Sequence, residues 1–590
     1  MSGTPPAYYD RVNRDLLQRI PVTARAVLEV GCGAGALGAA FKAINPTCHY
    51  VGIETVPDAA RVAADRLDQV LSADVEDPAL ALPALPPLDA LVYGDVLEHL
   101  REPWAVLARQ VPLLAPDGLL LACIPNVQHW SVLEQLLRGQ WPLAEEGIFD
   151  RTHLRWFTRA GIEELIKGCG LHLLELQPRV FRPEQAEAFV QRLEPALPGL
   201  GLDRQALLAG VAPLQYVVSA SPRPRQPLQL DALTLRPQAG MVEVRMAQPL
   251  AAVASLGGIG LRLRHGNLDL LRPDPALPRL LIWQRPALRR PEALPQLRQL
   301  LANDYVVVVE YDDDPDHWPD IAASGHLAFT GVHAVQVSTE VLAAKLRPHN
   351  PELAVFGNAL PALPPPPPPR QPQQPLRLFF GALNRQADWA PWIATLNRVL
   401  AESPECWQVE VVHDRSFFEA LELPARRFTP TCDYATYHQR LAGCDIAFLP
   451  LADTPFNRCK SDLKAVEAGG HGLAPLASPV VYGDSLRDGE TGRFFRTEEE
   501  LATVLRQWRD DPAAAVAIGA RARQWVAGSR LQHHQSAARA AWYRDLWRRR
   551  QELTAALLAR VPELAEVKGG LDNHAQLAGA PECDNSVTTP

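Results

Sequence analysis

The chain has 590 residues, of which 47% are hydrophobic and 21% charged, and its formal net charge is −9 at pH 7. This length predicts two to four domains with sizeable cores, and the negative charge argues against a general attraction to nucleic acid. No apolar stretch has the length of a membrane span, and nine scattered cysteines argue against a disulfide framework and for a reducing cytoplasm.

The N-terminal residues predict a helix and not a leader sequence. Residues 1–6 lack the basic and apolar regions of a signal peptide. Residues 8–20 predict a helix that would cover a ligand cleft. Across the chain no Cys/His cluster has the spacing of a zinc site, so we expect no metal on the grounds of spacing.

A glycine-rich turn organises the first third of the chain. Residues 26–30 are a short apolar run that predicts a buried strand. Gly31, Gly33 and Gly35 follow, where glycine permits a positive φ and a close approach of backbone to a ligand. Residues 36–41 then begin a helix. Strand, glycine turn and helix together predict the entry to a nucleotide-binding α/β domain.

Charge distinguishes between the two ligands that such a turn can bind. Residues 33–38 satisfy the G-x-G-x-x-G dinucleotide pattern, and a lone match is a weak signal. Glu29, just before the turn, would repel a pyrophosphate but would stabilise the cationic sulfonium and amino groups of S-adenosylmethionine. We therefore favour S-adenosylmethionine, and an NAD-dependent oxidoreductase is the disfavoured alternative.

Acids follow the next predicted strands, at the edge where open α/β sheets bind ligands. Glu54 ends the second strand, where a carboxylate accepts hydrogen bonds from both ribose hydroxyls. Asp74 ends the third strand, near the expected adenine, and Asp95 follows the fourth. The apolar runs that predict these strands are 49–54, 70–74, 88–93 and 118–124, and the alternations at 171–176 and 214–219 predict an antiparallel pair at the sheet edge.

Residues 25–220 resemble a class I S-adenosylmethionine-dependent methyltransferase. The resemblance is closer to the branch often found with surface-polysaccharide enzymes. Two segments carry it specifically, PNVQHW at 125–130 and GIFDRTHLRWFT at 147–158, together with the run DVLEHL at 95–100. The resemblance implies S-adenosylmethionine as the methyl donor.

Three histidines are candidates for the general base of methyl transfer. An acceptor hydroxyl must lose its proton as it attacks the methyl group, and histidine titrates near working pH. His153 is the first choice, because the neighbouring carboxylate of Asp150 would orient its ring. His99 and His129 are the others, and each of the three has a structural hydrogen-bonding role as its alternative. Histidines and acids could also hold a divalent metal, but no spacing demands one.

The rest of the chain predicts two further α/β domains. Proline-rich residues 221–227 open a predicted linker, and six prolines at 364–369 predict a stiff polyproline II spacer. Apolar runs at 280–283, 305–310 and 334–338, then at 376–381, 407–412, 445–450 and 473–477, predict buried parallel strands. The predicted domains are a methyltransferase over 1–220, a linker over 221–240, halves over 241–360 and 376–567 joined by a linker at 361–375, and a disordered tail over 568–590.

These two halves resemble a GT-B glycosyltransferase, in which two Rossmann-like domains face a cleft. The fold class is thus α/β, with a Rossmann-like methyltransferase followed by a double-Rossmann glycosyltransferase. Lys460 and Glu467 are seven residues apart, so we expect them on one face of a helix that Lys460 opens. Lys460 would meet a phosphate of a nucleotide sugar and Glu467 its ribose. Many related enzymes carry a second glutamate where this chain has Cys459, so contacts to the sugar differ or activity is lost.

Two charged clusters have alternative interpretations. Residues 312–314 are three aspartates after a strand, which would bind a metal or lie at the cleft edge. Arginines and aromatic residues alternate over 542–550, which would contact an anionic membrane surface or form a terminal helix packed across the two halves.

The sequence predicts a cytoplasmic bifunctional enzyme of glycan or surface-polysaccharide biosynthesis. One part would methylate a sugar hydroxyl with S-adenosylmethionine, and the other would transfer a sugar from a nucleotide sugar to a glycan or lipid-linked glycan. Neither nucleic acid nor a transmembrane segment is expected, although peripheral membrane contact fits the arginine-rich segment. The alternative is a methyltransferase whose degenerate glycosyltransferase part is a glycan-binding scaffold.

Overall fold

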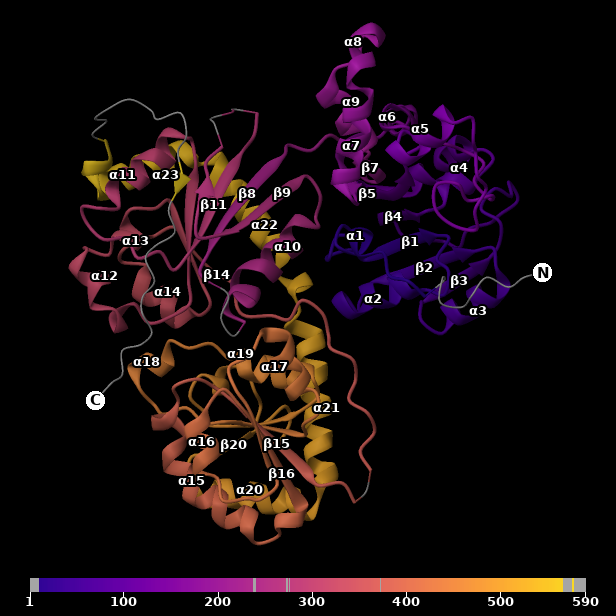
Figure 1. Ribbon diagram of the computed structural model, residues 1–590. Helices are drawn as coiled ribbons and strands as arrows, with labels where there is room; N and C mark the ends of the chain where they lie inside the picture. Colours follow the sequence, from indigo (N-terminus) through magenta and orange to yellow (C-terminus); the bar gives the residue numbers. More distant parts are fainter. Residues whose placement is uncertain are drawn as a thin grey trace. The chain divides into compact units, whose positions relative to one another are not determined.

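The computed structural model describes residues 10–236, 240–271, 274, 276–371, 373–565 and 576–577. The chain divides into two compact units, Met1–Pro227 with Ala254–Ile259, and Leu228–Val253 with Gly260–Pro590. Figure 1 shows one sheet in the first unit and two large sheets in the second. Among the described residues, none of the helices has the length and apolar character that crossing a membrane requires.

The first unit has a seven-stranded sheet of order β3-β2-β1-β4-β5-β7-β6. All neighbouring strands are parallel except β7, which is antiparallel to β5 and β6. The predicted antiparallel edge pair is therefore confirmed, and the sheet is the Rossmann-like sheet of a methyltransferase. Its strands are β1 (Ala26–Val30), β2 (His49–Glu54), β3 (Gln69–Ser72), β4 (Leu88–Gly94), β5 (Leu114–Pro125), β6 (His172–Val180) and β7 (Pro213–Ser221).

Both faces of this sheet are buried, which explains why its strands are continuous apolar runs. Leu28 and Val51 belong to the core on one face, and their neighbours Val27 and Tyr50 belong to the core on the other. The helices of this unit are α1 (Arg14–Leu17), α2 (Ala36–Ile44), α3 (Pro57–Ala64), α4 (Pro103–Gln110), α5 (Trp130–Leu137), α6 (Arg159–Gly168), α7 (Pro183–Leu193), α8 (Leu197–Leu200) and α9 (Arg204–Val211).

The helix predicted over residues 8–20 is shorter than expected. Only α1 is helical among the described part of that range, and residues 8–9 lie outside the described residues. The side chain of Asn13 accepts a hydrogen bond from Leu16 N at 3.3 Å, so it caps the helix and fixes its start.

The second unit begins with a six-stranded sheet of order β14-β13-β12-β11-β8-β9. Its strand β8 (Leu228–Thr234) corrects the predicted linker over 221–240, because β8 pairs in parallel with β11 inside the sheet. The prolines before β8 suggested a linker, but Asp231 is a buried residue of this strand. Arg262 neutralises its charge, and the hydroxyl of Tyr305 donates a hydrogen bond to it. The other strands are β9 (Ile259–His265), β11 (Arg279–Gln284), β12 (Val306–Tyr311), β13 (Ala334–Val337) and β14 (Leu353–Val355), and the short β10 (Leu268–Asp269) pairs with β21 (Gln576–Leu577).

The next sheet is parallel throughout, with the order β17-β16-β15-β18-β19-β20. Two successive Rossmann-like sheets are the architecture of a GT-B glycosyltransferase, so the predicted fold class is confirmed. Residues 361–371, which include the six prolines, contain no helix or strand. The strands are β15 (Leu376–Gly381), β16 (Trp407–Val412), β17 (Arg426–Thr429), β18 (Ile446–Leu449), β19 (Ala474–Ala477) and β20 (Arg493–Phe494).

The arginine-rich segment belongs to two helices, α22 (Ser536–Arg548) and α23 (Arg550–Arg560), and both pack on the first half of the second unit. Leu557 belongs to the core of that half, and Tyr543 OH donates to Gln336 Oε1 at 2.7 Å. The packing interpretation of the arginine-rich segment is confirmed. Apart from β21, the tail predicted as disordered lies outside the described residues.

The other helices of the second unit connect its strands. They are α10 (Gln248–Ala254), α11 (Leu294–Ala302), α12 (Pro319–Ala323), α13 (Leu327–Thr330), α14 (Glu340–Leu346), α15 (Gln386–Ala401), α16 (Arg415–Ala420), α17 (Tyr434–Leu441), α18 (Pro455–Arg458), α19 (Leu463–Gly470), α20 (Glu498–Asp510) and α21 (Pro512–Ser529).

The fragment 1–227 should fold alone, because every member of its cores precedes residue 221. It lacks the hydrogen bond from Val22 N to Ser255 Oγ, which is 3.1 Å long in the full chain. We expect the fragment to be destabilised by roughly 1 kcal/mol relative to this unit in the full chain. Thermal unfolding followed by circular dichroism checks this, with Ser255→Ala in the full chain as the matched variant. An insoluble or unfolded fragment would place the boundary elsewhere.

Candidate functional site

The glycine turn after β1 is a cradle that other residues cannot build. Gly31, Gly33 and Gly35 have φ of +72°, +54° and +77°. A Cβ on Gly31 would lie 2.4 Å from Val96 Cγ2, so a side chain there would both clash and strain the backbone. The carbonyl of Ile53 accepts hydrogen bonds from Gly31 N at 2.8 Å and from Cys32 N at 3.1 Å, which ties the turn to β2.

Two carboxylates lie beside this turn. Glu54 Oε2 accepts a hydrogen bond from Gly33 N at 2.8 Å, and Tyr50 OH donates to Glu29 Oε2 at 2.9 Å. Burial, opposed by the hydrogen bond from Tyr50 and assisted by the charge of Glu54, raises the pKa of Glu29 to about 8. Glu29 also acts on the turn electrostatically. Burial is the main cause that raises the pKa of the Cys32 thiol, and the charge of Glu29 is the next. Two acids at a glycine cradle fit a cationic ligand and disfavour a pyrophosphate.

The other two predicted cofactor residues lie at neighbouring strand ends. Asp74 is exposed beyond β3 and accepts a hydrogen bond from Glu76 N at 2.8 Å. Ala73 N donates a hydrogen bond to Glu54 O at 3.1 Å, and this bond keeps the chain that leads to Asp74 beside Glu54. Asp95, with φ of +55°, accepts a hydrogen bond from Gln215 Nε2 at 2.6 Å, and burial raises its pKa.

The structure brings His99 and His153 together across 54 residues of chain. Their rings lie 4.7 Å apart between centroids, edge to face. The carbonyl of Glu98 accepts hydrogen bonds from Leu154 N at 2.8 Å and from Arg155 N at 3.0 Å, which fastens the segment after α5 to the end of β4. Burial lowers the pKa of both imidazoles, so at neutral pH they are uncharged and able to accept a proton.

Asp150 does not orient the His153 ring through a hydrogen bond; burial lowers the pKa of this imidazole, and the charge of Asp150 raises it, as expected. His153 Nδ1 lies 3.2 Å from the carbonyl of Ile148, whereas Asp150 Oδ1 accepts a hydrogen bond from Thr152 Oγ1 at 2.6 Å. Thr152 Oγ1 lies 3.0 Å from His99 Nδ1. Because this hydroxyl donates to Asp150, it accepts from Nδ1–H of His99, and Nε2 is left as the basic nitrogen. The carboxylate therefore orients His99, through Thr152.

His129 lies outside this pair and has a structural role. It is the N-cap of α5, where its Nδ1 lies 2.8 Å from Ser131 Oγ and accepts from Ser131 N at 3.4 Å. Burial lowers its pKa to about 4.

Glu98 is a site residue that the sequence analysis missed. Its side chain is 2% exposed, and its Oε2 has no hydrogen-bond partner in the described part of the chain. Burial raises its pKa well above the usual range, and the charge of Asp95 adds to this. One ligand atom each of Glu98, His99 and His153 lies within 4.8 Å of the others, so these three could also hold a divalent metal ion. The acid directly before His99 in DVLEHL was the available signal.

In the second unit, the predicted Lys460–Glu467 face is wrong. Lys460 precedes α19, and its Nζ lies 2.7 Å from Asp313 Oδ1 and 4.1 Å from the centre of the Phe456 ring. Glu467 is within α19 and 1% exposed, and it accepts hydrogen bonds from Tyr434 OH at 2.9 Å and Lys464 Nζ at 3.3 Å.

The aspartate cluster after β12 is neutralised by cations. Arg285 lies 2.6 Å from Asp312 and 3.3 Å from Asp313, and Lys345 lies 2.6 Å from Asp314. Burial lowers the pKa of Lys460, as do the charges of Arg385 and Arg285, while Asp313 raises it. Two cationic side chains, Arg285 and Lys460, thus contact the Asp313 carboxylate, a setting that suits an anion such as a diphosphate.

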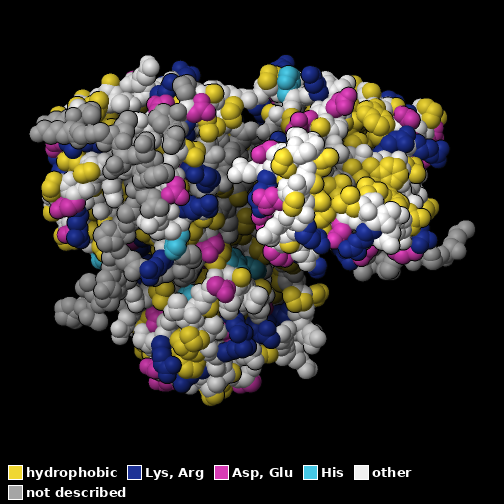
Figure 2. All heavy atoms as spheres, turned by 45° about the horizontal axis from the view of Figure 1, so that its top comes forward, with side chains coloured by type: hydrophobic (Ala, Val, Ile, Leu, Met, Phe, Trp, Pro, Cys, Tyr) yellow, Lys and Arg dark blue, Asp and Glu magenta, His cyan; other side chains and the backbone are white. Residues whose placement is uncertain are grey.

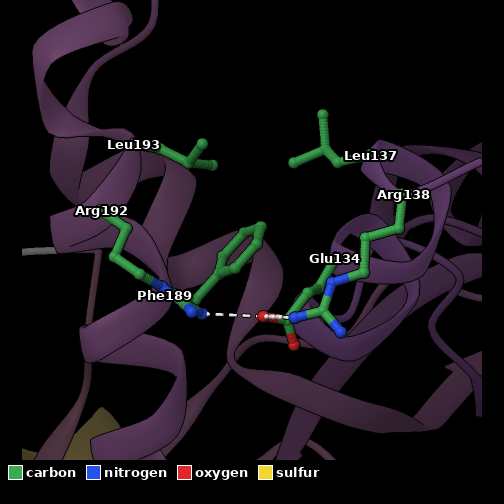
Figure 3. A pocket seen from close by; sticks show the side chains of 6 residues that line it. All are labelled: Glu134, Leu137, Arg138, Phe189, Arg192 and Leu193. Atoms are coloured by element: carbon green, nitrogen blue, oxygen red, sulfur yellow. Dashed lines mark hydrogen bonds and ion pairs between the residues drawn. The ribbon is translucent and has the colours of Figure 1, made fainter.

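A separate hollow of about 190 Å³ lies between α5 and α7 (Figure 3). Glu134 lies between two arginines in this hollow, with Arg138 at 3.1 Å and Arg192 at 3.0 Å. Leu137 and Leu193 lie above these ion pairs (Figure 3). The hollow contains none of the predicted site residues.

Comparisons with known proteins match the first unit by sequence. A family model for the methyltransferase domain matches residues 28–120. The ubiquinone biosynthesis O-methyltransferase of Xylella fastidiosa (strain 9a5c) is 31% identical over 172 residues, 28% of this chain and 68% of that protein.

Solved structures resemble the second unit at low identity. TarM is 10% identical over 45% of this chain and 54% of its own, with a TM-score of 0.36. HepE of Anabaena, in complex with UDP and glucose, is 14% identical over 53% of this chain and 99% of its own, with a TM-score of 0.38. The chain thus spans about half the length of TarM. Both TM-scores are below 0.5, and the GT-B assignment depends on the strand order.

Binding of S-adenosylmethionine should release protons from Glu29. Because the pKa of this carboxyl is about 8, it is mostly protonated at pH 7, and a cationic ligand favours the carboxylate. We expect wild-type protein to release up to about 0.9 proton more than Glu29→Gln at pH 7, and its relative affinity to rise between pH 6 and 8. Calorimetry in two buffers of different ionisation enthalpy measures this. Equal proton release by both proteins would contradict the role of Glu29.

Proposed function

The chain belongs to the class I S-adenosylmethionine-dependent methyltransferases, and we propose that it is a bifunctional enzyme of glycan assembly. Its first unit methylates a sugar hydroxyl, and its second transfers a sugar from a nucleotide sugar. The observation that carries the first activity is the Asp150–Thr152–His99 relay beside the acidic glycine turn.

The relay fits a general base for O-methylation. S-adenosylmethionine, when bound, supplies an electrophilic methyl group. His99 Nε2 accepts the proton of the acceptor hydroxyl, and His99 Nδ1–H donates to Thr152. Asp150, bound to Thr152 Oγ1, stabilises the imidazolium that forms. Glu29 and Glu54 hold the cationic and ribose ends of the donor, with Asp74 near the adenine and Asp95 at the end of β4.

Three features support a sugar hydroxyl as the acceptor. The relative from Xylella fastidiosa is named as an O-methyltransferase, so oxygen is its acceptor atom. The segments at 125–130 and 147–158 resemble the surface-polysaccharide branch of the family. The same chain also carries a GT-B unit. We place the enzyme in the cytoplasm because of its odd number of scattered cysteines.

The donor site of the second activity lies at Lys460. A diphosphate of the nucleotide sugar replaces the Asp313 carboxylate between Lys460 and Arg285, and Glu467 turns from Tyr434 to the ribose. Lys460, Arg285 and Glu467 therefore make as many charge-assisted hydrogen bonds with the nucleotide sugar as they make without it.

The second candidate for this unit is a glycan-binding scaffold without transfer activity. Three observations favour it. Cys459 is buried in the core of the first half where related enzymes carry a glutamate. Lys460 is paired with Asp313, and both oxygens of Glu467 already have partners.

His99→Asn should lower the rate of methyl transfer by about 10²–10⁴-fold, because it removes the base. Binding of S-adenosylhomocysteine should be unchanged. Transfer of a labelled methyl group to oligosaccharide acceptors, read by mass spectrometry, measures the rate. Thr152→Val should give a smaller loss, and His129→Asn, which keeps a helix cap, is the matched control. If His99→Asn stays fully active and His153→Asn does not, the assignment of the base is wrong.

Asp313→Asn should tighten the binding of UDP or GDP by roughly tenfold, about 1.4 kcal/mol, because it removes the competing carboxylate. Lys460→Ala and Glu467→Ala should each abolish binding while methylation is unaffected. Calorimetry of the full chain with a panel of nucleotide sugars measures this. If no nucleotide binds wild type or Asp313→Asn, the scaffold becomes the better description.

A further inference from the structure

Large hydrophobic side chains are exposed at the end of α5 and on the segment between α5 and α6. Hydrophobic side chains gather on the visible face of the first unit (Figure 2). Single exposed apolar residues are ordinary, but several on one short segment beside a reaction site indicate a binding surface. Those exposed on residues 136–156 are Leu136, Leu137, Trp141, Leu143, Leu154 and Trp156.

Three aromatic rings of this segment form what we term the aromatic platform, namely Trp141, Phe149 and Trp156. The ring of Trp141 lies 5.1 Å from Phe149 and 5.8 Å from Trp156, edge to face in both cases. Trp141 is 38% exposed and Trp156 49% exposed, so each presents ring surface to solvent.

The platform is built on a closed loop. Ala144 N donates to Phe149 O at 2.9 Å, and Arg151 N donates to Ala144 O at 3.1 Å. The turn is therefore fixed at both ends, and Phe149, against which Trp141 packs, is held in place before a ligand arrives.

Two residues of the platform are direct chain neighbours of residues that contact the reaction site. Trp156 follows Arg155, whose amide donates to the carbonyl of Glu98 at 3.0 Å, and Phe149 precedes Asp150 of the relay. A molecule that lies on the platform and reaches His99 is therefore the methyl acceptor.

Charge selects the class of molecule. Residues 138–156 contain three arginines and three carboxylates, so the segment has no excess charge that would attract an anionic lipid surface. At its rim Arg151 lies 2.6 Å from Glu145, and both side chains are more than half exposed. A guanidinium beside a carboxylate presents donors and acceptors to neighbouring hydroxyls. A flat ring presents a negative face to the C–H groups of a neutral ligand.

We propose that the aromatic platform is the acceptor subsite of the methyltransferase, where a pyranose ring stacks on Trp156 and contacts the nearly perpendicular ring of Trp141. The stacked ring places a hydroxyl of the same glycan toward His99, while Arg151 and Glu145 bind hydroxyls at the rim. The inference rests on the proposed function, and it adds the place and the mode by which the sugar is recognised.

Saturation-transfer NMR on the full-length protein with S-adenosylhomocysteine tests the subsite. The probes are methyl pyranosides of gluco, galacto, manno and rhamno configuration. We expect transfer to the C–H protons of one ring face of at least one glycoside, reduced at least about fivefold in Trp156→Ala and Trp141→Ala. Trp156→Phe keeps an aromatic face and should retain the signal. The comparison of Trp156→Phe with Trp156→Ala therefore tests the subsite even if Trp141→Ala unfolds. Leu200→Ala, a change at an exposed residue of α8, should have no effect.

Three results would overturn the subsite. The first is that protein that binds S-adenosylhomocysteine shows no saturation transfer to any of the glycosides. The second is that saturation transfer is unchanged in both alanine variants. The third is that the alanine variants lose binding to vesicles or lose a dimer that the wild-type protein forms. The last result would assign the platform to a lipid surface or to a second copy of the chain. Failure of wild-type protein to bind S-adenosylhomocysteine would instead contradict the proposed methyltransferase.

Discussion

Two main-chain hydrogen bonds hold the candidate methylation site together. The carbonyl of Glu98 accepts from Leu154 N and Arg155 N, and this brings a segment from beyond β5 to the end of β4. Thr152, two residues before Leu154, lies within hydrogen-bond distance of His99. Trp156 follows directly after this junction, and Phe149 directly precedes Asp150 of the relay. The base and the relay therefore meet at one backbone junction, whose hydrogen bonds do not use the side chains at 154 and 155.

The second unit depends on a different constraint, the balance of charge around Asp313. Arg285 and Lys460 come from separate halves of that unit and share this carboxylate. A buried cation without a counter-ion is costly, so the carboxylate stabilises the contact between the halves. The same reasoning explains why the neighbouring aspartates are paired with Arg285 and Lys345 and not with each other.

The local features of the fold could be predicted, and the long-range ones could not. The strand and turn around Gly31 follow from an apolar run and from glycines that occupy positive φ. Strand β8 was missed because Asp231 interrupts its apolar pattern, and its partner Arg262 is visible only after folding. The helix at Lys460 was placed too early, because α19 begins at Leu463, after Asp462. Spacing in sequence paired Asp150 with His153, whereas folding pairs it with His99 through Thr152.

The central claim is that His99 is a neutral base with its proton on Nδ1. The ¹⁵N chemical shifts of the His99 ring in labelled full-length protein, assigned with His99→Asn, report the tautomer and the charge directly. The account predicts a neutral ring at pH 7, protonated at Nδ1, with a pKa below the ordinary value because burial disfavours the charged form. A ring that is doubly protonated at pH 7, or protonated at Nε2, would contradict it.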